Sequence, residues 1–271
     1  MNAQGLPWRT RHKGACVAAL ALAALSGCAT VPPGAAAPAA ASQADPWENW
    51  NRKVFAFNEA LDGAVLKPVA QTYRDVVPSL ARSGVSNVLG NLHDVWSAAN
   101  QFLQGKVQTG LEMGMRVLTN TVFGLGGLLD PASEMGLARR SEDFGQTLGR
   151  WGLGNGPYLV LPLFGPSTLR DTAGLVVDRR AAPSTLPDST AASYGVSALE
   201  VVNTRSQLLA AGQLLDQVAL DKYSFMRDAY LARRRDALYD GAPPMEVFID
   251  EGADAPAPPA PAASAASAPG K

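Results

Sequence analysis

The chain has few of the residues that build disulfides and metal sites. Its 271 residues include two cysteines and two histidines. If the chain is cleaved before Cys28, Cys16 and His12 leave with the N-terminal segment, and His93 is the histidine that remains. Four-coordinate zinc sites need several Cys or His ligands, and a disulfide needs a cysteine pair. We therefore expect no metal, no cofactor and no disulfide.

Motifs of catalysis and nucleic-acid binding are also missing. There is no Gly-x-Ser-x-Gly nucleophile elbow, and the glycines of residues 152–156 have neither a preceding strand nor a following Lys-Ser/Thr pair. Adjacent acids such as Glu142 and Asp143 are more typical of a solvated surface than of an acid–base pair. The net charge is −1, and no basic binding signature occurs. We expect no catalytic residues, no enzyme activity and no nucleic-acid partner.

Residues 1–27 predict a lipoprotein signal peptide. Three basic residues precede an Ala/Leu-rich run over residues 14–25, which is shorter than the roughly 20 residues that cross a bilayer. The Leu-Ser-Gly-Cys sequence that ends at Cys28 resembles the bacterial lipobox, in which the cysteine is acylated. Ala29, where an aspartate would favour inner-membrane retention, favours the outer membrane. We expect a lipid anchor at Cys28 on the periplasmic face of the outer membrane. The alternative is an ordinary signal peptide with Cys28 as a free thiol.

Composition divides the rest of the chain into three parts. Residues 28–44 are mostly Ala and Pro, which indicates a semi-rigid linker that reaches about 50 Å from the anchor at about 3.1 Å per residue. Residues 45–250 carry the large apolar residues and form the expected folded domain. Residues 251–271 are Ala, Pro and Ser with few large apolar groups, and they predict a disordered tail.

The folded part has helical periodicity, and its first helix has a recognisable start. Asp45 is an expected N-cap, with Pro46 at the first helical position and Glu48 three residues after the cap. Gly63 is placed to end this helix. The apolar stripe between these signals comprises Trp47, Trp50, Val54, Phe57 and Leu61.

Further helices are expected on both sides of an irregular middle. They cover residues 80–103, 106–123 and 222–239, with Gly105 between the first two. One side of the second carries Val107, Leu111, Met115, Leu118 and Val122, and one side of the third carries Tyr223, Met226 and Tyr230. A heptad seam expected to pack on a neighbouring helix comprises Val201, Thr204, Leu208, Ala211, Leu215 and Val218. No strand pattern of comparable length occurs, so we predict an all-α fold.

Glycines and aromatic residues mark two features with two interpretations each. Gly110 and Gly114, like Gly145 and Gly149, are four residues apart, a spacing that lets helices approach closely in a membrane or in a soluble core. Trp47 and Trp50 favour a membrane interface near the anchor, with core packing as the alternative. The apolar block 158–164 is too short to cross a bilayer, so it belongs to a core, an interface or a partly inserted segment.

Several sequence blocks resemble the MlaA/VacJ lipoprotein family, in the family's order between about residues 45 and 241. The blocks are residues 51–58, 73–78, 84–87, 102–105, 144–149, 156–162 and 165–171. The resemblance implies an all-helical ring in the inner leaflet of the outer membrane, with an amphipathic channel that takes phospholipid out of the membrane. It also implies two protein partners, an outer-membrane porin trimer and a soluble MlaC-like lipid carrier, and a role in lipid asymmetry.

Given that resemblance, the glycine-rich middle is our candidate for a channel wall or hinge, because glycine permits backbone rearrangement. The candidate residues are Gly124, Gly126, Gly127, Gly152, Gly154, Gly156, Tyr158, Leu161 and Phe164. Two other functions compete with lipid transport. One is a structural envelope lipoprotein that braces porins without moving lipid. The other is an envelope hydrolase, which the missing histidine partner argues against.

Overall fold

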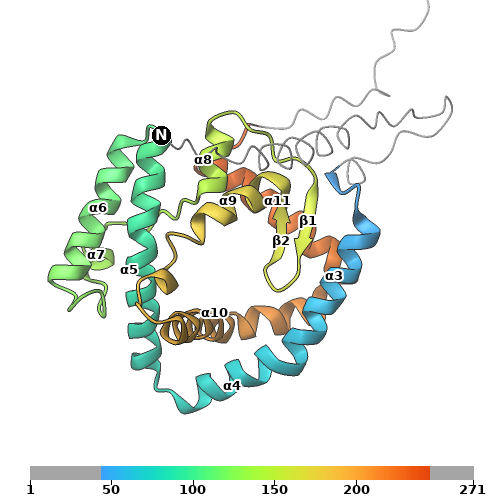
Figure 1. Cartoon of the computed structure of the whole chain (residues 1–271), viewed down its shortest axis with the longest axis horizontal. Helices are drawn as coiled ribbons and strands as arrows, with labels where there is room; N and C mark the ends of the chain where they lie inside the picture. The colour runs from blue at the N-terminus through green and yellow to red at the C-terminus, as the bar shows by residue number, and fades with distance from the viewer. Residues whose placement is uncertain (1–43, 245–271) are drawn as a thin grey trace, which may run out of the picture.

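The computed structural model describes residues 44–244, and these are predominantly helical (Figure 1). The α-helices are α3 Glu48–Leu61, α4 Lys67–Val76, α5 Ser79–Leu103, α6 Val107–Val122, α7 Pro131–Glu134, α8 Phe144–Arg150, α9 Leu169–Asp178, α10 Thr190–Val218 and α11 Lys222–Leu238. A π-helical turn spans Asp62–Leu66 and a 3-10 turn spans Pro183–Thr185. The strands are β1 Tyr158–Leu161 and β2 Gly165–Thr168. The signal peptide, Cys28, the linker and the tail lie outside the described residues.

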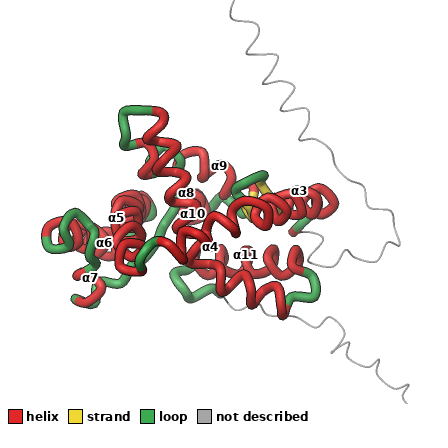
Figure 2. The backbone as a smooth tube through the Cα atoms, turned by 90° about the horizontal axis from the view of Figure 1, so that it is seen from below, coloured by secondary structure: helices red, strands yellow, loops and turns green. Residues whose placement is uncertain are grey.

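The helices are arranged as a flat ring. Down the shortest axis, α3, α4 and α5 follow one another around the ring, and α8, α9 and α11 occupy the opposite side (Figure 1). Helix α10 packs along the inner side of α4, and α6 packs on the outside of α5. The β1–β2 hairpin points inward from the side of α3. Turned by 90°, the molecule is clearly thinner than it is wide (Figure 2). The predicted all-α class is confirmed.

The first helix does not end at Gly63. Helix α3 continues through the π-helical turn directly into α4. A glycine costs about 1 kcal/mol relative to alanine within a helix, which is too little to stop a helix that tertiary contacts hold. Here the contact is Arg205 of α10, whose Nε and Nη2 donate to the two carboxylate oxygens of Asp62 at 2.7 and 2.6 Å.

The predicted N-cap at Asp45 is also wrong. Helix α3 begins at Glu48, and the Trp47 carbonyl accepts from the amides of Trp50 and Asn51. The Asp45 carboxylate is instead buried and accepts from Asn51 Nδ2 at 2.8 Å and from the Tyr223 hydroxyl. The Asp45 carboxylate therefore accepts from two side chains, Asn51 and Tyr223, and not from the free amides at the start of the helix.

The apolar block 158–164 forms most of a hairpin that the sequence did not predict. Strands β1 and β2 are antiparallel, with Tyr158 opposite Thr168 and Leu161 opposite Gly165. Four-residue strands give too few alternations to separate a strand from a short apolar run. Tyr158 and Val160 point into a small apolar cluster with Val54 and Tyr223.

Polar side chains fill most of the interior. Among the described residues, the buried polar side chains outnumber the buried apolar ones by about two to one. The predicted seam of α10 is wrong, because Val201, Leu208 and Val218 are exposed. The buried residues of α10 are Asn203, Ser206 and Leu209. Soluble cores are normally apolar, so this fold is inverted relative to a soluble helical bundle. No helix within residues 44–244 has the length and hydropathy needed to span a membrane.

Candidate functional site

Arg116 is the centre of a buried polar network that joins α5, α6 and α7. Its side chain is 1% exposed. Its Nε lies 3.1 Å from Asp94 Oδ2 on α5, and its Nη2 lies 2.5 Å from Asp130 Oδ2, at the start of α7. Burial raises the pKa of Asp130, but hydrogen bonds from Ser133 and Arg116 outweigh it and hold that pKa at about 2. An ion pair this well bonded fixes the three helices relative to one another.

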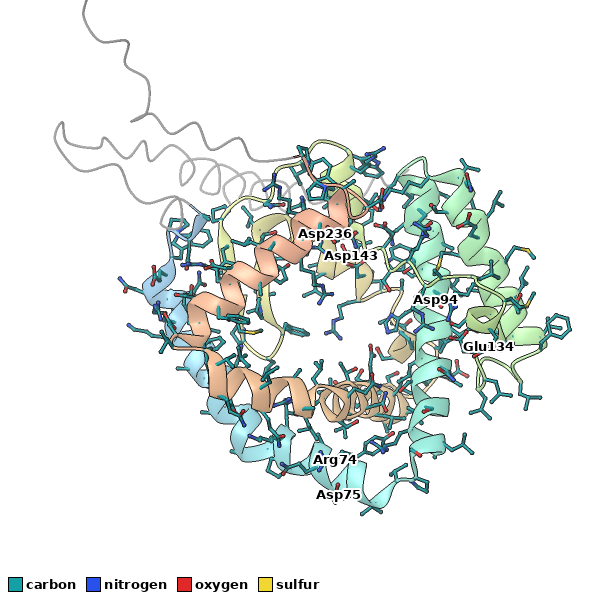
Figure 3. All side chains as sticks on the ribbon, turned by 180° about the vertical axis from the view of Figure 1, so that it is seen from behind. Arg74, Asp75, Asp94, Glu134, Asp143 and Asp236 are labelled. Carbon is teal, nitrogen blue, oxygen red and sulfur yellow. The ribbon has the colours of Figure 1, made fainter. Side chains whose placement is uncertain are left out.

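Arg234 is the centre of a second network, between α8, α9 and α11. Its guanidinium lies 2.5 Å from Asp143 Oδ2 and 2.7 Å from Asp171 Oδ1, and the Tyr230 hydroxyl donates to Asp171 Oδ2 at 2.8 Å. Burial opposes ionisation of both carboxyl groups, but Arg234 outweighs it and lowers both pKa values. Asp143 lies beside α11, whereas the surface pair Arg74 and Asp75 lies at the outer margin (Figure 3).

The outside of α6 is apolar. Its predicted stripe, which we call the α6 stripe, is 55% to 66% exposed and comprises Val107, Leu111, Met115, Leu118 and Val122. The opposite face of the helix is buried and mainly polar, with Arg116, Thr119 and Asn120. A groove of about 680 Å³ follows the stripe; it is lined by Val107, Gln108, Leu111, Glu112, Met115, Thr119, Met135 and Leu137. One helix thus separates a polar side from an apolar side.

A second apolar groove lies between α4 and α10. Its volume is about 450 Å³, and it is lined by Pro68, Val69, Thr72, Tyr73, Val76, Val77 and Val202. Val69 and Val76 are exposed, as are Trp47, just before α3, at 44% and Trp50, on α3, at 58%. The core interpretation of these tryptophans is therefore wrong, and their placement at a membrane interface stays a prediction.

Two asparagines of α3 hold the outer edge of the hairpin. Asn51 donates from Nδ2 to the Tyr158 carbonyl at 3.1 Å and accepts from the Val160 amide at 2.9 Å. Asn58 donates to the Leu161 carbonyl at 3.0 Å and accepts from the Leu163 amide at 2.9 Å. Each primary amide therefore replaces the donor and acceptor that a neighbouring strand would supply.

The hairpin tip contacts the end of α9. The Arg179 guanidinium carbon lies 4.5 Å from the centre of the Phe164 ring, and Phe164 is 54% exposed. Leu163 at the tip has φ +70°, a left-handed conformation that is uncommon for a leucine. The tip therefore combines a strained residue with a cation–π contact, which is worth about 0.5–1 kcal/mol at an exposed site.

The candidate glycines lie in two separate turns. Gly124, Gly126 and Gly127 follow α6, where Gly127 packs on Asn91 of α5, whereas the glycines of residues 152–156 lie between α8 and β1. Figure 1 places these turns on different parts of the ring. Of the other candidates, Tyr158 is fully buried, Leu161 is half-buried and Phe164 is exposed. Tyr158, Leu161 and Phe164 lie together on the hairpin, but the glycine turn at residues 124–127 is not next to them.

Three of the four paired glycines lie at helix contacts: a Cβ on Gly110 would lie 2.9 Å from the Phe102 ring of α5, and one on Gly149 would lie 2.8 Å from Leu238 of α11. A Cβ on Gly174 of α9 would lie 2.5 Å from the Gly145 backbone nitrogen of α8, so these helices touch through their backbones. Gly114 of α6 has open space where its Cβ would be. Close approach is therefore confirmed for Gly145 and not for Gly114.

Sequence reasoning missed Asn51, Asn58, Arg116 and Arg234 as organising residues. The signal for the first two was present, since residues seven apart share a helix face. Arg116 lies on the face of α6 opposite the apolar stripe. From the sequence alone, a charged residue there is equally well explained by exposure to solvent. Within residues 44–244, no group of three or more His, Cys, Asp or Glu residues is placed to hold a metal ion.

Comparison with known proteins identifies the class of this helical ring. The family model for "MlaA lipoprotein" matches residues 43–237. The chain therefore belongs to the MlaA lipoprotein family.

Named relatives and a solved structure agree with this assignment. The chain is 40% identical over 198 residues to the intermembrane phospholipid transport system lipoprotein MlaA of Escherichia coli, covering 70% of this chain and 77% of that protein. The protein of that name from Haemophilus influenzae is 34% identical over 209 residues, with 73% and 80% covered. A solved structure described as the structural basis for maintenance of bacterial outer membrane lipid asymmetry is 39% identical, with a TM-score of 0.63 over 72% of this chain and 98% of that one.

Proposed function

We propose that this protein is an outer-membrane lipoprotein that removes mislocalised phospholipid from the outer leaflet. The lipid leaves through an amphipathic path in the helical ring and passes to a periplasmic carrier, which maintains lipid asymmetry. Membership of a family whose named members belong to an intermembrane phospholipid transport system supports this proposal. The anchor is Cys28, which lies outside the described residues.

The observation that carries the proposal is the inverted packing of α6. A phospholipid head group in hydrocarbon costs several kcal/mol, whereas its acyl chains favour an apolar surface. A ring with a polar inside and an apolar outside offers a polar path to the head group and an apolar surface to the acyl chains. The α6 stripe supplies the apolar side, and the buried network around Arg116 holds α6 on α5 and α7.

The ring lies within one leaflet in this proposal. The exposed stripes of α3, α4 and α6 contact acyl chains, and Trp47 and Trp50 lie at the interface, where amphipathic rings are favoured. The acyl groups on Cys28 and the linker 28–44 keep the ring at the periplasmic side of the outer membrane.

The hairpin and the turn 152–156 form the wall or hinge of the lipid path in this proposal. The hairpin supports it, because it points into the ring and meets α9 through Phe164. The turn Gly124 to Gly127 has a supporting role, since its packing against α5 fixes the end of α6. The protein partners are a porin trimer in the plane of the membrane and an MlaC-like carrier in the periplasm.

A pair of lysine substitutions tests membrane embedding and transport together. Leu111→Lys with Leu118→Lys places two charges on the α6 stripe, and Gln213→Lys, as the control, adds a charge to an exposed polar position of α10 that lines neither groove. We expect the double variant to raise outer-leaflet phospholipid, measured in intact cells by phospholipase accessibility, at an unchanged protein level. The control should match the wild-type protein.

The competing function, a brace for porins, makes a different prediction. If the protein is only a brace, it should co-purify with a porin. Deleting its gene should then leave outer-leaflet phospholipid at the wild-type level. Cys28→Ala tests the anchor separately, because membrane fractionation should find that variant unprocessed or released into the periplasm. Full retention in the outer membrane with fatty-acid label would contradict the lipobox assignment.

A further inference from the structure

Arg179 at the hairpin tip and a charged pair between α5 and α10 form a cluster of charged side chains from three helical segments. Arg179 follows α9, His93 is on α5 and Glu200 is on α10. Arg179 and His93 are exposed, and Glu200 is partly exposed. The structural networks around Arg116 and Arg234 do not include these three residues, so their role in the proposed function is open.

The end of α9 holds Arg179 in a fixed position. The preceding residue, Asp178, accepts at Oδ1 from the Trp96 indole nitrogen at 2.7 Å and from the Phe144 amide at 2.9 Å. These bonds tie the end of α9 to both α5 and α8. The Arg179 amide donates to the Leu175 carbonyl, which keeps its backbone helical. Its guanidinium then covers the exposed ring of Phe164.

Glu200 supplies the opposite charge nearby. Its Oε1 lies 2.8 Å from His93 Nε2, across the contact between α10 and α5. The hydrogen bond from His93 lowers the pKa of Glu200, and the charges of His93 and Arg179 lower it further. Trp96, which donates to Asp178 beside Arg179, is one helical turn from His93 on α5, and His93 contacts Glu200. The guanidinium and the carboxylate therefore lie on the same part of the surface, where their charges interact.

We propose that this cluster binds the head group of a zwitterionic phospholipid, with Arg179 on the phosphate and Glu200 on the ammonium group. This inference rests on the proposed function. A guanidinium can bind a phosphodiester through two parallel hydrogen bonds. A carboxylate beside it attracts an ethanolamine ammonium, whereas the neutral glycerol head group of phosphatidylglycerol has no cation to pair with it. The site therefore selects phosphatidylethanolamine over phosphatidylglycerol.

The test uses the full chain extracted in detergent and exposed to equal amounts of the two lipids in mixed micelles. Lipid that stays bound through gel filtration is quantified by mass spectrometry. Arg179→Gln should retain about tenfold less phosphatidylethanolamine than the wild-type protein. Arg180→Gln removes the same charge from the adjacent exposed position and should retain lipid within twofold of wild type. Glu200→Gln should shift the bound lipid toward phosphatidylglycerol.

Two further measurements separate this site from a structural latch and from a general anion site. Phe164→Leu removes the cation–π contact but keeps an apolar tip, and it should reduce retention much less than Arg179→Gln does. Inorganic phosphate at millimolar concentration should not displace the lipid, whereas glycerophosphoethanolamine should compete. Thermal unfolding of each variant verifies its fold.

The outcomes distinguish the two proposals. Any of three results would overturn the head-group site. Arg180→Gln could lose as much lipid as Arg179→Gln does, Phe164→Leu could lose as much as Arg179→Gln does, or inorganic phosphate could displace the lipid. An unchanged lipid ratio in Glu200→Gln would overturn the role of that carboxylate. If the wild-type protein retains neither lipid, the proposed function itself fails.

Discussion

The two glycine turns differ in how much room their residues have. A Cβ on Gly124 would lie 2.4 Å from the Asn120 carbonyl oxygen and 2.5 Å from that of Leu129. In the other turn, a Cβ on Gly154 would have no neighbour within 4 Å. The turn after α6 therefore contains a tightly packed glycine, Gly124, whereas the turn after α8 contains one with open space, Gly154; Gly126 is also open, and Gly156 meets Leu169.

This difference separates a scaffold from a candidate hinge. A turn whose glycines touch other backbone atoms cannot change conformation without moving its neighbours, because interiors are close-packed. A turn with open space around it can move at small cost. Glycine content alone gave both turns the same predicted role, and the contacts favour the turn at 152–156 as the hinge of our proposal.

The strongest effect should come from Gly124→Val, which tests the packed turn. The new side chain would meet two backbone oxygens that cannot rotate away, so we expect a loss of about 3 kcal/mol or more in the free energy of unfolding. Chemical denaturation of the purified protein measures it. A loss below about 1 kcal/mol would mean that this turn is looser than its contacts indicate.

Gly156→Val should have an intermediate effect on stability, because Gly156 has both a left-handed backbone conformation and a close neighbour. Its φ is +65°, and a Cβ would lie 3.1 Å from the Leu169 Cβ. Left-handed strain in a β-branched residue costs on the order of 1–3 kcal/mol. Denaturant unfolding should show a loss in this range, and Gly156→Ala should show a smaller one. Equal losses would assign the whole effect to φ.

Acidification should weaken the region of the packed turn. The folded-state pKa of Asp130 is about 2, below its ordinary value of 3.8. Its contribution to stability is therefore complete above pH 4 and is lost as the pH falls through about 2. The denaturation midpoint should drop over this window. Asp130→Asn should be less stable at pH 7 and should lose less on acidification; an unchanged pH dependence would remove Asp130 from this role.

Gly154→Val should have the smallest effect on folding and is the sharpest test of the hinge. Its φ lies outside the left-handed region and its Cβ position is open, so the change in stability should stay below about 0.5 kcal/mol. If the turn is a hinge, outer-leaflet phospholipid should rise in intact cells at normal protein abundance. Wild-type phospholipid levels would reject the hinge, and a parallel fall in abundance would show that Gly154 serves the fold.

Most helices could be predicted from the sequence because their period is local. The breaks at Gly105 and through residues 124–165 also follow from local residue properties, and Gly105 indeed has φ +76°. The direction in which a stripe faces is not local. The period of Val107 to Val122 defines one face of α6, but only the partner helix decides that this face is the exposed one. In the same way, α10 turns Asn203 and Ser206 inward and Leu208 outward.

Contacts between distant segments decided the features that the sequence did not predict. Asp45 is paired with Tyr223 from the other end of the domain, so its capping pattern had a stronger competitor. The hairpin is too short for its alternation to be recognised, and Asn51 and Asn58 hold it over a long sequence separation. The charged cluster at Arg179 likewise comes from three segments that no spacing rule connects.

The asparagine pair gives α3 a fixed length. At about 100° per residue, seven residues bring Asn58 back to nearly the angular position of Asn51, two turns farther along the axis. One residue inserted or deleted between them would rotate one amide by about 100° relative to the other. The hairpin could then keep its bonds to only one of them. The same match fixes the spacing along the axis, because a whole inserted turn would restore the angle but move one amide by about 5.4 Å. The chain can therefore vary in its linker and loops, but not in its length between these two asparagines.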